Sequence, residues 1–127
     1  MQSATTRKSN TTKLYNKTVA NMRELGTYKV EFDAPIRRYA ELSIQYAILN
    51  DQWYENGCVI TEEYTNKSGA TNQRKTALYL SMETLRKELI EIENLFGLTP
   101  KGLKAIKTNG LDQAKKSKLD EVLMSNA

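Results

Sequence analysis

The sequence has no histidine and a single cysteine, and these two shortages exclude several kinds of site. A catalytic centre built on histidine is excluded, and Cys58 cannot form a disulfide within the chain. Zinc sites need several Cys or His ligands, so the composition excludes them as well. Gly97, Gly102 and Gly110 are too dispersed to form a phosphate-binding loop. We therefore expect a protein that is not an enzyme and that has no metal, cofactor or small-molecule substrate.

Long apolar runs are also missing from the sequence. A membrane-spanning helix needs about 18 or more consecutive apolar residues, and the polar N-terminus lacks the apolar core of a secretion signal. We therefore expect a cytoplasmic protein without membrane contact. Only 39% of the 127 residues are hydrophobic, which is a low share for one self-sufficient domain. An oligomer whose protomers share a core would compensate for this shortage.

Charge is distributed unevenly along the chain. Residues 1–29 carry six Lys and Arg against one acid, residues 30–66 carry two against seven, residues 67–100 carry five against four, and residues 101–127 carry six against three. The positive charge is therefore concentrated at the two ends. Basic ends are typical of segments that contact nucleic acid, although a run of charge also fits a plain solvated face.

The middle of the chain predicts two long amphipathic helices, at residues 34–56 and 72–96. Each carries large apolar side chains at spacings of three and four residues, which places them on one helical face. The stripe of the first helix is formed by Tyr39, Leu42, Tyr46, Leu49 and Trp53, and that of the second by Leu78, Met82, Leu85, Leu89, Ile92 and Phe96. Because the first helix is apolar around more than half of its circumference, it has to be covered from two directions.

Residues 58–70 connect these helices and are predicted to form a short β-hairpin or an ordered loop. Strand formers fill the first half of this connector, and Asn66-Lys67-Ser68-Gly69 has turn chemistry. Asp33 is predicted as the N-cap of the first helix, and Thr71 or Asn72 as the N-cap of the second. The two helices match in length, so we expect an antiparallel pair with the connector at its tip.

The segment Gly97-Leu98-Thr99-Pro100 is predicted to end the second long helix and to begin another. Gly97 suits the left-handed position after a helix, Thr99 suits the next N-cap, and Pro100 suits the first turn. A short helix at residues 100–108 then directs three lysines outward, which are Lys101, Lys104 and Lys107.

The two ends of the chain complete a fold that is mainly α, with residues 13–109 as one helical domain. Residues 1–12 are predicted to be a flexible basic arm, because they hold almost nothing to bury. A helix at residues 13–25 follows. The candidate phosphate contacts of the arm and this helix are Arg7, Lys8, Lys13, Lys17 and Arg23. Residues 111–127 are expected to be a disordered or partner-binding tail with an apolar patch of Leu119, Val122 and Leu123.

Together these features resemble the small subunit of tailed-phage terminases, over residues 36–107. The likeness rests on Tyr39-Ala40, Gly57, Asn72 and Gly97-Leu98-Thr99-Pro100. Two positions depart from the family pattern. Gln73 stands where the family tends to have Pro, and Lys101-Gly102 replaces a continuation that is richer in Ser and Arg.

The resemblance implies a protein that assembles as a ring-like homo-oligomer and binds double-stranded viral DNA. It also implies a second partner, the large terminase subunit with its ATPase and nuclease activities, which the small subunit recruits or regulates. The basic N-terminal part would contact DNA, and the C-terminal tail would contact the large subunit. The place of action would be the cytoplasm of an infected or lysogenic bacterial host, during genome packaging into the procapsid.

Two other functions fit the residues. In the first, Gly97-Leu98-Thr99 is the turn of a helix-turn-helix regulator, and Lys101, Lys104 and Lys107 face DNA. In the second, the chain is a helical adaptor that binds only protein. The mass of the protein in solution distinguishes the terminase from the regulator, because a ring favours the terminase and a dimer favours the regulator.

Overall fold

The structure is a computed structural model that describes residues 3–108. Within these residues three α-helices and one two-stranded antiparallel hairpin confirm the prediction of a mainly α-helical fold. The elements in chain order are α1 (Ala4–Leu25), the 3₁₀ turn η1 (Val30–Phe32), α2 (Asp33–Glu55), β1 (Thr61–Thr65), β2 (Thr71–Lys75) and α3 (Ala77–Phe96). Residues 100–108 are helical again.

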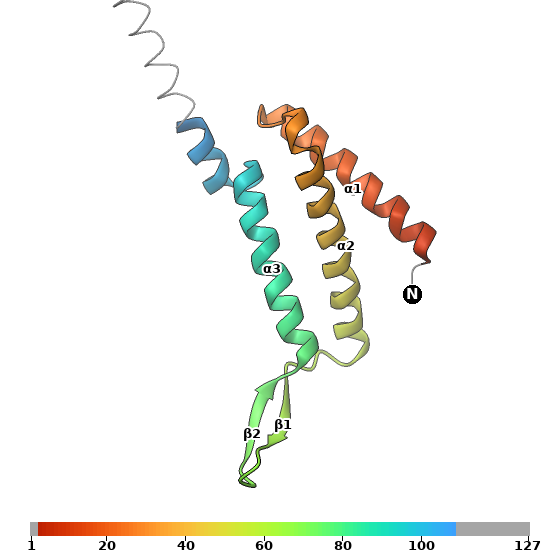
Figure 1. Cartoon of the computed structure of the whole chain (residues 1–127), viewed down its shortest axis with the longest axis vertical. Coiled ribbons are helices and arrows are strands. Elements are labelled where there is room, and N and C mark those ends of the chain that lie inside the picture. Colours follow the sequence, from red (N-terminus) through yellow and green to blue (C-terminus); the bar gives the residue numbers. More distant parts are fainter. Residues whose placement is uncertain (1–2, 109–127) are drawn as a thin grey trace, which may run out of the picture.

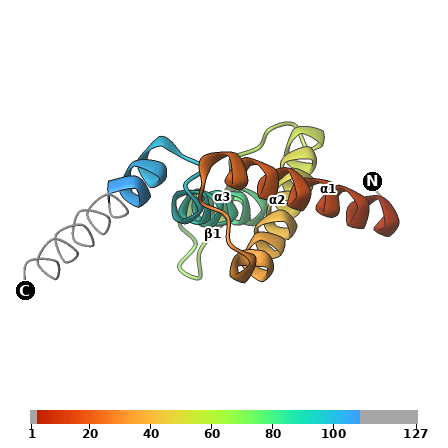
Figure 2. The same cartoon turned by 90° about the horizontal axis from the view of Figure 1, so that it is seen from above.

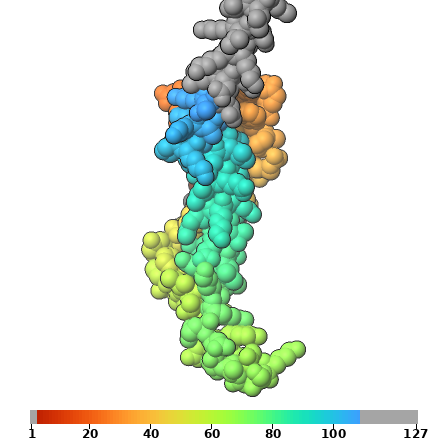
Figure 3. Space-filling model, turned by 90° about the vertical axis from the view of Figure 1, so that its left-hand side faces the viewer, coloured from red at the N-terminus to blue at the C-terminus, as the bar shows by residue number. Residues whose placement is uncertain are grey.

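Helix α2 is the central element, because it packs against both α1 and α3 (Figure 1). The chain reverses its direction after α1 and again after α2, so each packed pair is antiparallel. Seen from above, α1 crosses over the other two helices, and its N-terminal half points away from them (Figure 2). The hairpin projects from the end of the α2–α3 pair that lies opposite the turn between α1 and α2 (Figures 1 and 3).

A small core forms where the end of α1, the start of α2 and the end of α3 meet. Each helix contributes one buried side chain to it, namely Met22, Ile36 and Phe96. Partly buried apolar residues surround this centre, and they are Tyr15, Val19, Tyr28, Phe32, Tyr39, Ile92 and Leu98. The contact of all three helices is therefore concentrated at one end of the molecule.

The predicted apolar stripes of α2 and α3 face each other, but one protomer covers them only in part. Ring contacts of Tyr39 with Phe96 and of Trp53 with Tyr79 link the two helices along their length. Met82, Leu89 and Phe96 are buried on α3. The other members are partly exposed, and they are Leu78, Leu85 and Ile92 on α3 and Tyr39, Leu42, Tyr46, Leu49 and Trp53 on α2. Apolar surface thus remains for a further contact.

The prediction of a flexible arm at residues 1–12 is wrong for the described part of that segment, because α1 already begins at Ala4. The side chain of Ser3 caps this helix by accepting a hydrogen bond from the Thr6 N–H at 3.1 Å. Extending a helix costs much less than starting one, so polar turns can precede a packed segment. The packed segment here is the later part of α1, where Met22 is buried.

The predicted β-hairpin is present, but its second strand occupies residues that were expected to start the second long helix. Asn72 pairs with Tyr64 across the hairpin, so it is not a helix cap. The cap of α3 is Thr76, whose Oγ1 accepts a hydrogen bond from the Tyr79 N–H at 3.2 Å. The predicted helix start at residue 72 is therefore wrong.

The turn of the hairpin explains this difference. Asn66 Oδ1 accepts hydrogen bonds from the N–H groups of Ser68 and Ala70, and Gly69 has a φ of 87°. A turn centred on these residues needs a second strand as long as the first, and Thr71–Lys75 supplies it. Local pairing therefore overrides the weak preference of this polar segment for a helix.

The joint after α3 has the predicted stop, turn and restart. Gly97 has a φ of 73°, and the Leu98 N–H donates to the Glu93 carbonyl at 2.9 Å, which is the pattern of a Schellman motif. Thr99 Oγ1 then accepts a hydrogen bond from the Gly102 N–H at 3.0 Å and caps the next helix. Gly102 is itself buried against α3, because a Cβ atom there would lie 2.1 Å from the Asn94 carbonyl oxygen.

We predict that Gly102→Ala destabilises this joint, although the same change in an open helix would stabilise it by about 1 kcal/mol. The added methyl group would force residues 100–108 away from Asn94. Hydrogen exchange should become faster across residues 100–108, and the melting temperature should fall. Lys104→Ala, at an exposed position of the same helix, is the control. A more stable Gly102→Ala protein would contradict the close packing.

Ile36→Ala tests the core. Because Ile36 is fully buried, the substitution should lower the free energy of unfolding by about 2–5 kcal/mol in urea denaturation at fixed protein concentration. Lys87→Ala is the control, since Lys87 is polar and exposed on α3 and the change should stay within about 0.5 kcal/mol. Equal effects of the two substitutions would show that the core lies elsewhere.

Candidate DNA and assembly surfaces

All five N-terminal cations predicted to contact DNA lie on α1. The side chains of Lys8, Lys13, Lys17 and Arg23 are exposed, and Arg7 is partly buried. Lys13 and Lys17 are one turn apart and share a helical face. From residue 7 to residue 23 the array spans about 24 Å at 1.5 Å per residue. No acid lies in the first turn of α1, so the partial positive charge of the helix N-terminus adds to that of the cations.

Arg23 differs from the other four cations because its guanidinium stacks over a ring. Its Cζ atom lies 4.7 Å from the centroid of Tyr28, in the segment that leads from α1 to η1. This contact orients the guanidinium but leaves it exposed. Among the exposed cations of α1, Arg23 is therefore the one whose charged group is oriented by a ring contact.

The second predicted cationic group, Lys101, Lys104 and Lys107, is exposed on the helical residues 100–108. This helix and the start of α1 lie on opposite sides of the molecule in both views (Figures 1 and 2). The structure therefore does not bring the two groups together within one protomer. One protomer would therefore contact a straight segment of DNA through one of these two cationic groups and not through both.

Asp33 holds α1 against the start of α2. The Tyr15 hydroxyl donates a hydrogen bond to the Asp33 carboxylate, and the Arg37 guanidinium lies 4.4 Å from the centroid of the Tyr15 ring. Arg37 also pairs with Asp33 at 3.6 Å. The prediction of Asp33 as an N-cap is wrong, because the capping position is Phe32 and no side chain caps this end. Nothing in the sequence indicated the pairing of Tyr15, in the middle of α1, with Asp33 at the start of α2.

A polar cleft of about 340 Å³ lies between the three helices, beside the core. Its lining consists of Leu14, Lys17, Thr18, Asn21, Tyr39, Glu93 and Leu98. The Tyr39 hydroxyl donates a hydrogen bond to Glu93 Oε1 at 2.9 Å, and the Tyr39 ring makes an edge contact with Phe96 at 6.0 Å between centroids. Burial, and then the neighbouring Glu93 carboxylate, raise the pKa of Tyr39 to about 12. The hydrogen bond between Tyr39 and Glu93 in this cleft thus links α2 to α3.

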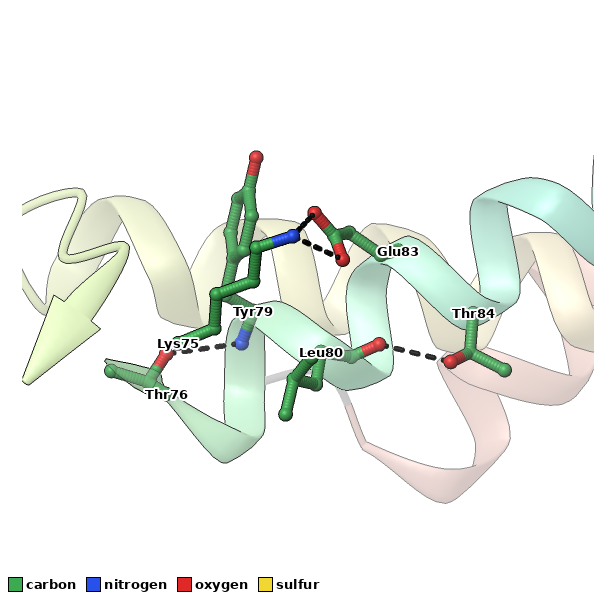
Figure 4. A network of polar contacts seen from close by, with 6 residues as sticks. All are labelled: Lys75, Thr76, Tyr79, Leu80, Glu83 and Thr84. Carbon is green, nitrogen blue, oxygen red and sulfur yellow. Dashed lines mark hydrogen bonds and ion pairs between the residues drawn. The ribbon is translucent and has the colours of Figure 1, made fainter. Parts of the chain in front are cut away.

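A network of contacts fixes the root of the hairpin on α3 (Figure 4). Lys75 Nζ lies 2.9 Å and 3.1 Å from the two carboxylate oxygens of Glu83. This hydrogen bond is the main reason why the pKa of Lys75 is raised and that of Glu83 is lowered. Further along α3, Arg86 Nε donates to the Tyr46 hydroxyl at 3.2 Å and links α3 to α2. The end of β2 is therefore tied to the first two turns of α3.

The predicted large-subunit contacts Leu119, Val122 and Leu123 lie outside the described residues. Among residues 3–108 no cluster of His, Cys, Asp and Glu is arranged to hold a metal ion. Within the same part of the chain, no helix has the length and apolar character needed to cross a membrane.

The Tyr39 hydroxyl provides a pH test of the cleft. Folding raises the pKa of this phenol from 10.0 to about 12, so the neutral form stabilises the fold below pH 10, and this contribution is lost as the pH rises towards 12. Tyr39→Phe should lower the free energy of unfolding by about 1 kcal/mol at neutral pH. It should also remove the latest step in a tyrosine absorbance titration. Tyr54→Phe, at a 63% exposed position, should leave that step in place.

Comparison with known protein families gives a match that covers most of the chain. The family described as phage terminase, small subunit, matches residues 11–113, a segment that contains α2, the hairpin and α3 in full. Neither the curated proteins nor the solved structures gave a match. The resemblance seen in the sequence is therefore confirmed at the level of the family. This chain belongs to the phage terminase small subunit family, and its membership supports a role in phage genome packaging.

Proposed function

We propose that this chain binds double-stranded viral DNA, assembles as a ring-like oligomer and recruits or regulates the large terminase subunit. The observation that carries the proposal is the family match over residues 11–113. The protein would act in the cytoplasm of an infected or lysogenic bacterial host, where genomes are packaged into procapsids. It would supply binding surfaces, and the large subunit would supply the ATPase and nuclease chemistry.

DNA binding is assigned to α1. Its cations lie along one helix whose N-terminal half points away from α2 (Figure 2), whereas residues 30–66 carry two Lys and Arg against seven acids. Phosphates would be attracted to the first surface and repelled by the second. Lysines without a base-reading partner bind phosphates at any sequence, so this contact would position DNA and would not select a site.

Oligomer formation is supported by the incomplete cover of the apolar stripes. All five predicted stripe residues of α2 remain partly exposed in the protomer. Large apolar residues elsewhere are more exposed still, and they include Tyr54, Leu80, Ile90 and Leu95. Burying such surface between copies of the chain would supply stability that one protomer lacks.

A helix-turn-helix regulator is the second candidate, and one observation favours it. Lys101, Lys104 and Lys107 are all exposed on a short helix that follows a tight turn after α3. The three lysines would bind phosphates better than bases, and α3 has 20 residues, which is long for the first helix of this motif. The two candidates differ in which cationic group binds DNA: the terminase would use the cations of α1, and the regulator would use Lys101, Lys104 and Lys107.

Replacing Arg7, Lys8, Lys13 and Lys17 together by Ala should weaken DNA binding for every sequence tested. Removal of each phosphate contact should flatten the dependence of log K on log salt by about 0.9. Replacing Lys101, Lys104 and Lys107 by Ala is the matched control and should change the slope less. Fluorescence anisotropy between 50 and 300 mM salt, roughly the range over which such contacts weaken, measures both. An unchanged slope for the first variant with a flattened slope for the second would favour the regulator.

Truncation after Asn109 should leave assembly intact but abolish binding of the large subunit. The reason is that residues 11–109 hold nearly all of the family match, whereas the apolar patch of the tail is small and suits folding on a partner. Co-purification with the large subunit measures this binding. The full-length chain with Leu119→Ala, Val122→Ala and Leu123→Ala together should lose the same binding, which would assign the loss to the apolar patch and not to the shorter chain. A truncated chain that no longer assembles would make the tail part of the oligomer.

A further inference from the structure

The hairpin is ordered around specific contacts, yet it buries none of its own residues. Every residue of β1 and β2 is exposed, and the hairpin stands clear of the helices (Figure 3). Its sheet has two strands, and no other strand of residues 3–108 joins it. Isolated two-stranded hairpins are marginally stable in water. An exposed hairpin of this kind is better explained by a contact with another molecule.

Polar contacts hold the hairpin in one register. The Thr65 and Thr71 hydroxyls hydrogen-bond at 3.1 Å next to the turn. On the other face Arg74 pairs with Glu62 at 3.1 Å, and its guanidinium lies 4.2 Å from the centroid of the Tyr64 ring. Together with the Lys75–Glu83 pair at the root (Figure 4), these contacts favour one register of the two strands. A strand that is already extended loses less conformational entropy when it pairs with another strand.

The hydrogen bonds at the two ends of the ladder show which main-chain groups face outward. The Thr76 N–H donates to the Ile60 carbonyl at 2.9 Å, and the Asn66 N–H donates to the Ala70 carbonyl at 3.0 Å. Hydrogen-bonded pairs alternate with non-hydrogen-bonded pairs in an antiparallel ladder, so the groups between them point to the open edges. The outward-facing residues are Thr61, Glu63 and Thr65 on β1 and Thr71, Gln73 and Lys75 on β2.

The two open edges carry opposite charge. Strand β1 contains Glu62 and Glu63 and has no base, whereas β2 contains Arg74 and Lys75 and has no acid. Glu63 stands opposite the neutral Gln73 within the hairpin. A second hairpin that offered its β2 edge to this β1 edge would bring a basic strand to an acidic one. Two β1 edges would instead bring like charges together.

We propose that the hairpins of neighbouring protomers pair edge to edge, with β1 of one copy against β2 of the next. The inference rests on the oligomer of the proposed function and names the surface that joins its subunits. Such a contact uses different patches on its two sides, and it closes into a ring if the rotation between copies allows. Within a ring the neighbouring edges run antiparallel, as in the hairpin itself.

DNA is a less suitable occupant of the hairpin. A two-stranded ribbon can enter the major groove, and Lys67, Arg74 and Lys75 would favour phosphates. However, the acidic β1 with Glu62 and Glu63 lies beside the basic β2, so the hairpin would present both signs of charge to a phosphate backbone. Exposed apolar side chains also surround the root, among them Val59 and Ile60. A protein edge fits this combination better than a phosphate backbone.

Paired single-cysteine variants test the proposal. Both chains carry Cys58→Ser, one also carries Glu63→Cys, the other also carries Gln73→Cys, and the two are co-expressed with different tags. Pairing of β1 with β2 of the next copy should give disulfide-linked heterodimers containing both tags, whereas either variant alone should give at least tenfold less linked product. Linked homodimers from a single variant would show that identical edges meet and would overturn the proposal.

Removing one outward N–H provides a second readout. Gln73→Pro deletes an edge donor without touching the hydrogen bonds inside the hairpin, and Gln73→Ala keeps the donor as the control. Light scattering should show a lower assembly mass for Gln73→Pro only. Unchanged mass with weaker DNA binding would make the hairpin a DNA contact and would overturn the proposal.

The same measurements separate this inference from the proposed function. Absence of heterodimers from an assembly of normal mass would overturn the hairpin pairing and leave the oligomer standing. A monomer for the unsubstituted chain would overturn the oligomer itself.

Discussion

The contact of three helices around Met22, Ile36 and Phe96 is the constraint on which the rest of the protomer depends. It sits at one end of the helices, where Tyr15 and Asp33 also join α1 to α2. Because α1 is held by the other helices mainly there, its N-terminal half leaves them at an angle and carries Arg7 and Lys8 away from the acidic α2. Towards the opposite end only α2 and α3 remain in contact among the described residues, through Met82, which is buried, and through the ring contact of Trp53 with Tyr79. That end holds the exposed hairpin and the partly covered stripes, so apolar and main-chain surface remains available for other molecules.

This arrangement places the proposed contacts at separate ends of one small chain. The start of α1 is directed to one side, the hairpin projects from the far end of α2 and α3, and residues 100–108 lie on the side opposite the start of α1 (Figures 1 and 2). A protomer built in this way would contact DNA and a neighbouring copy at the same time, without one contact blocking the other. A compact globule with the same residues would bring these surfaces closer together.

Periodic and local signals in the sequence predicted the long helices and the joint at Gly97-Leu98-Thr99-Pro100, because such signals do not depend on distant partners. Signals that depend on a partner were missed. The strand nature of Thr71–Lys75 follows from pairing with Thr61–Thr65, and the turn at Asn66 was the available clue. Gly102 looked unfavourable in a helix, since nothing in the sequence places it against the Asn94 carbonyl. The candidate cations on α1 were found, but their separation from Lys101 needed the fold.

The central claim is that the protomer is incomplete and that copies of it cover the apolar surface left between α2, α3 and the hairpin. Native mass spectrometry of the purified full chain at micromolar concentration tests this most directly. The expected result is one dominant closed oligomer of more than two chains, with no monomer population, whose subunit number does not change on dilution. A stable monomer, or a dimer that does not grow, would contradict the claim.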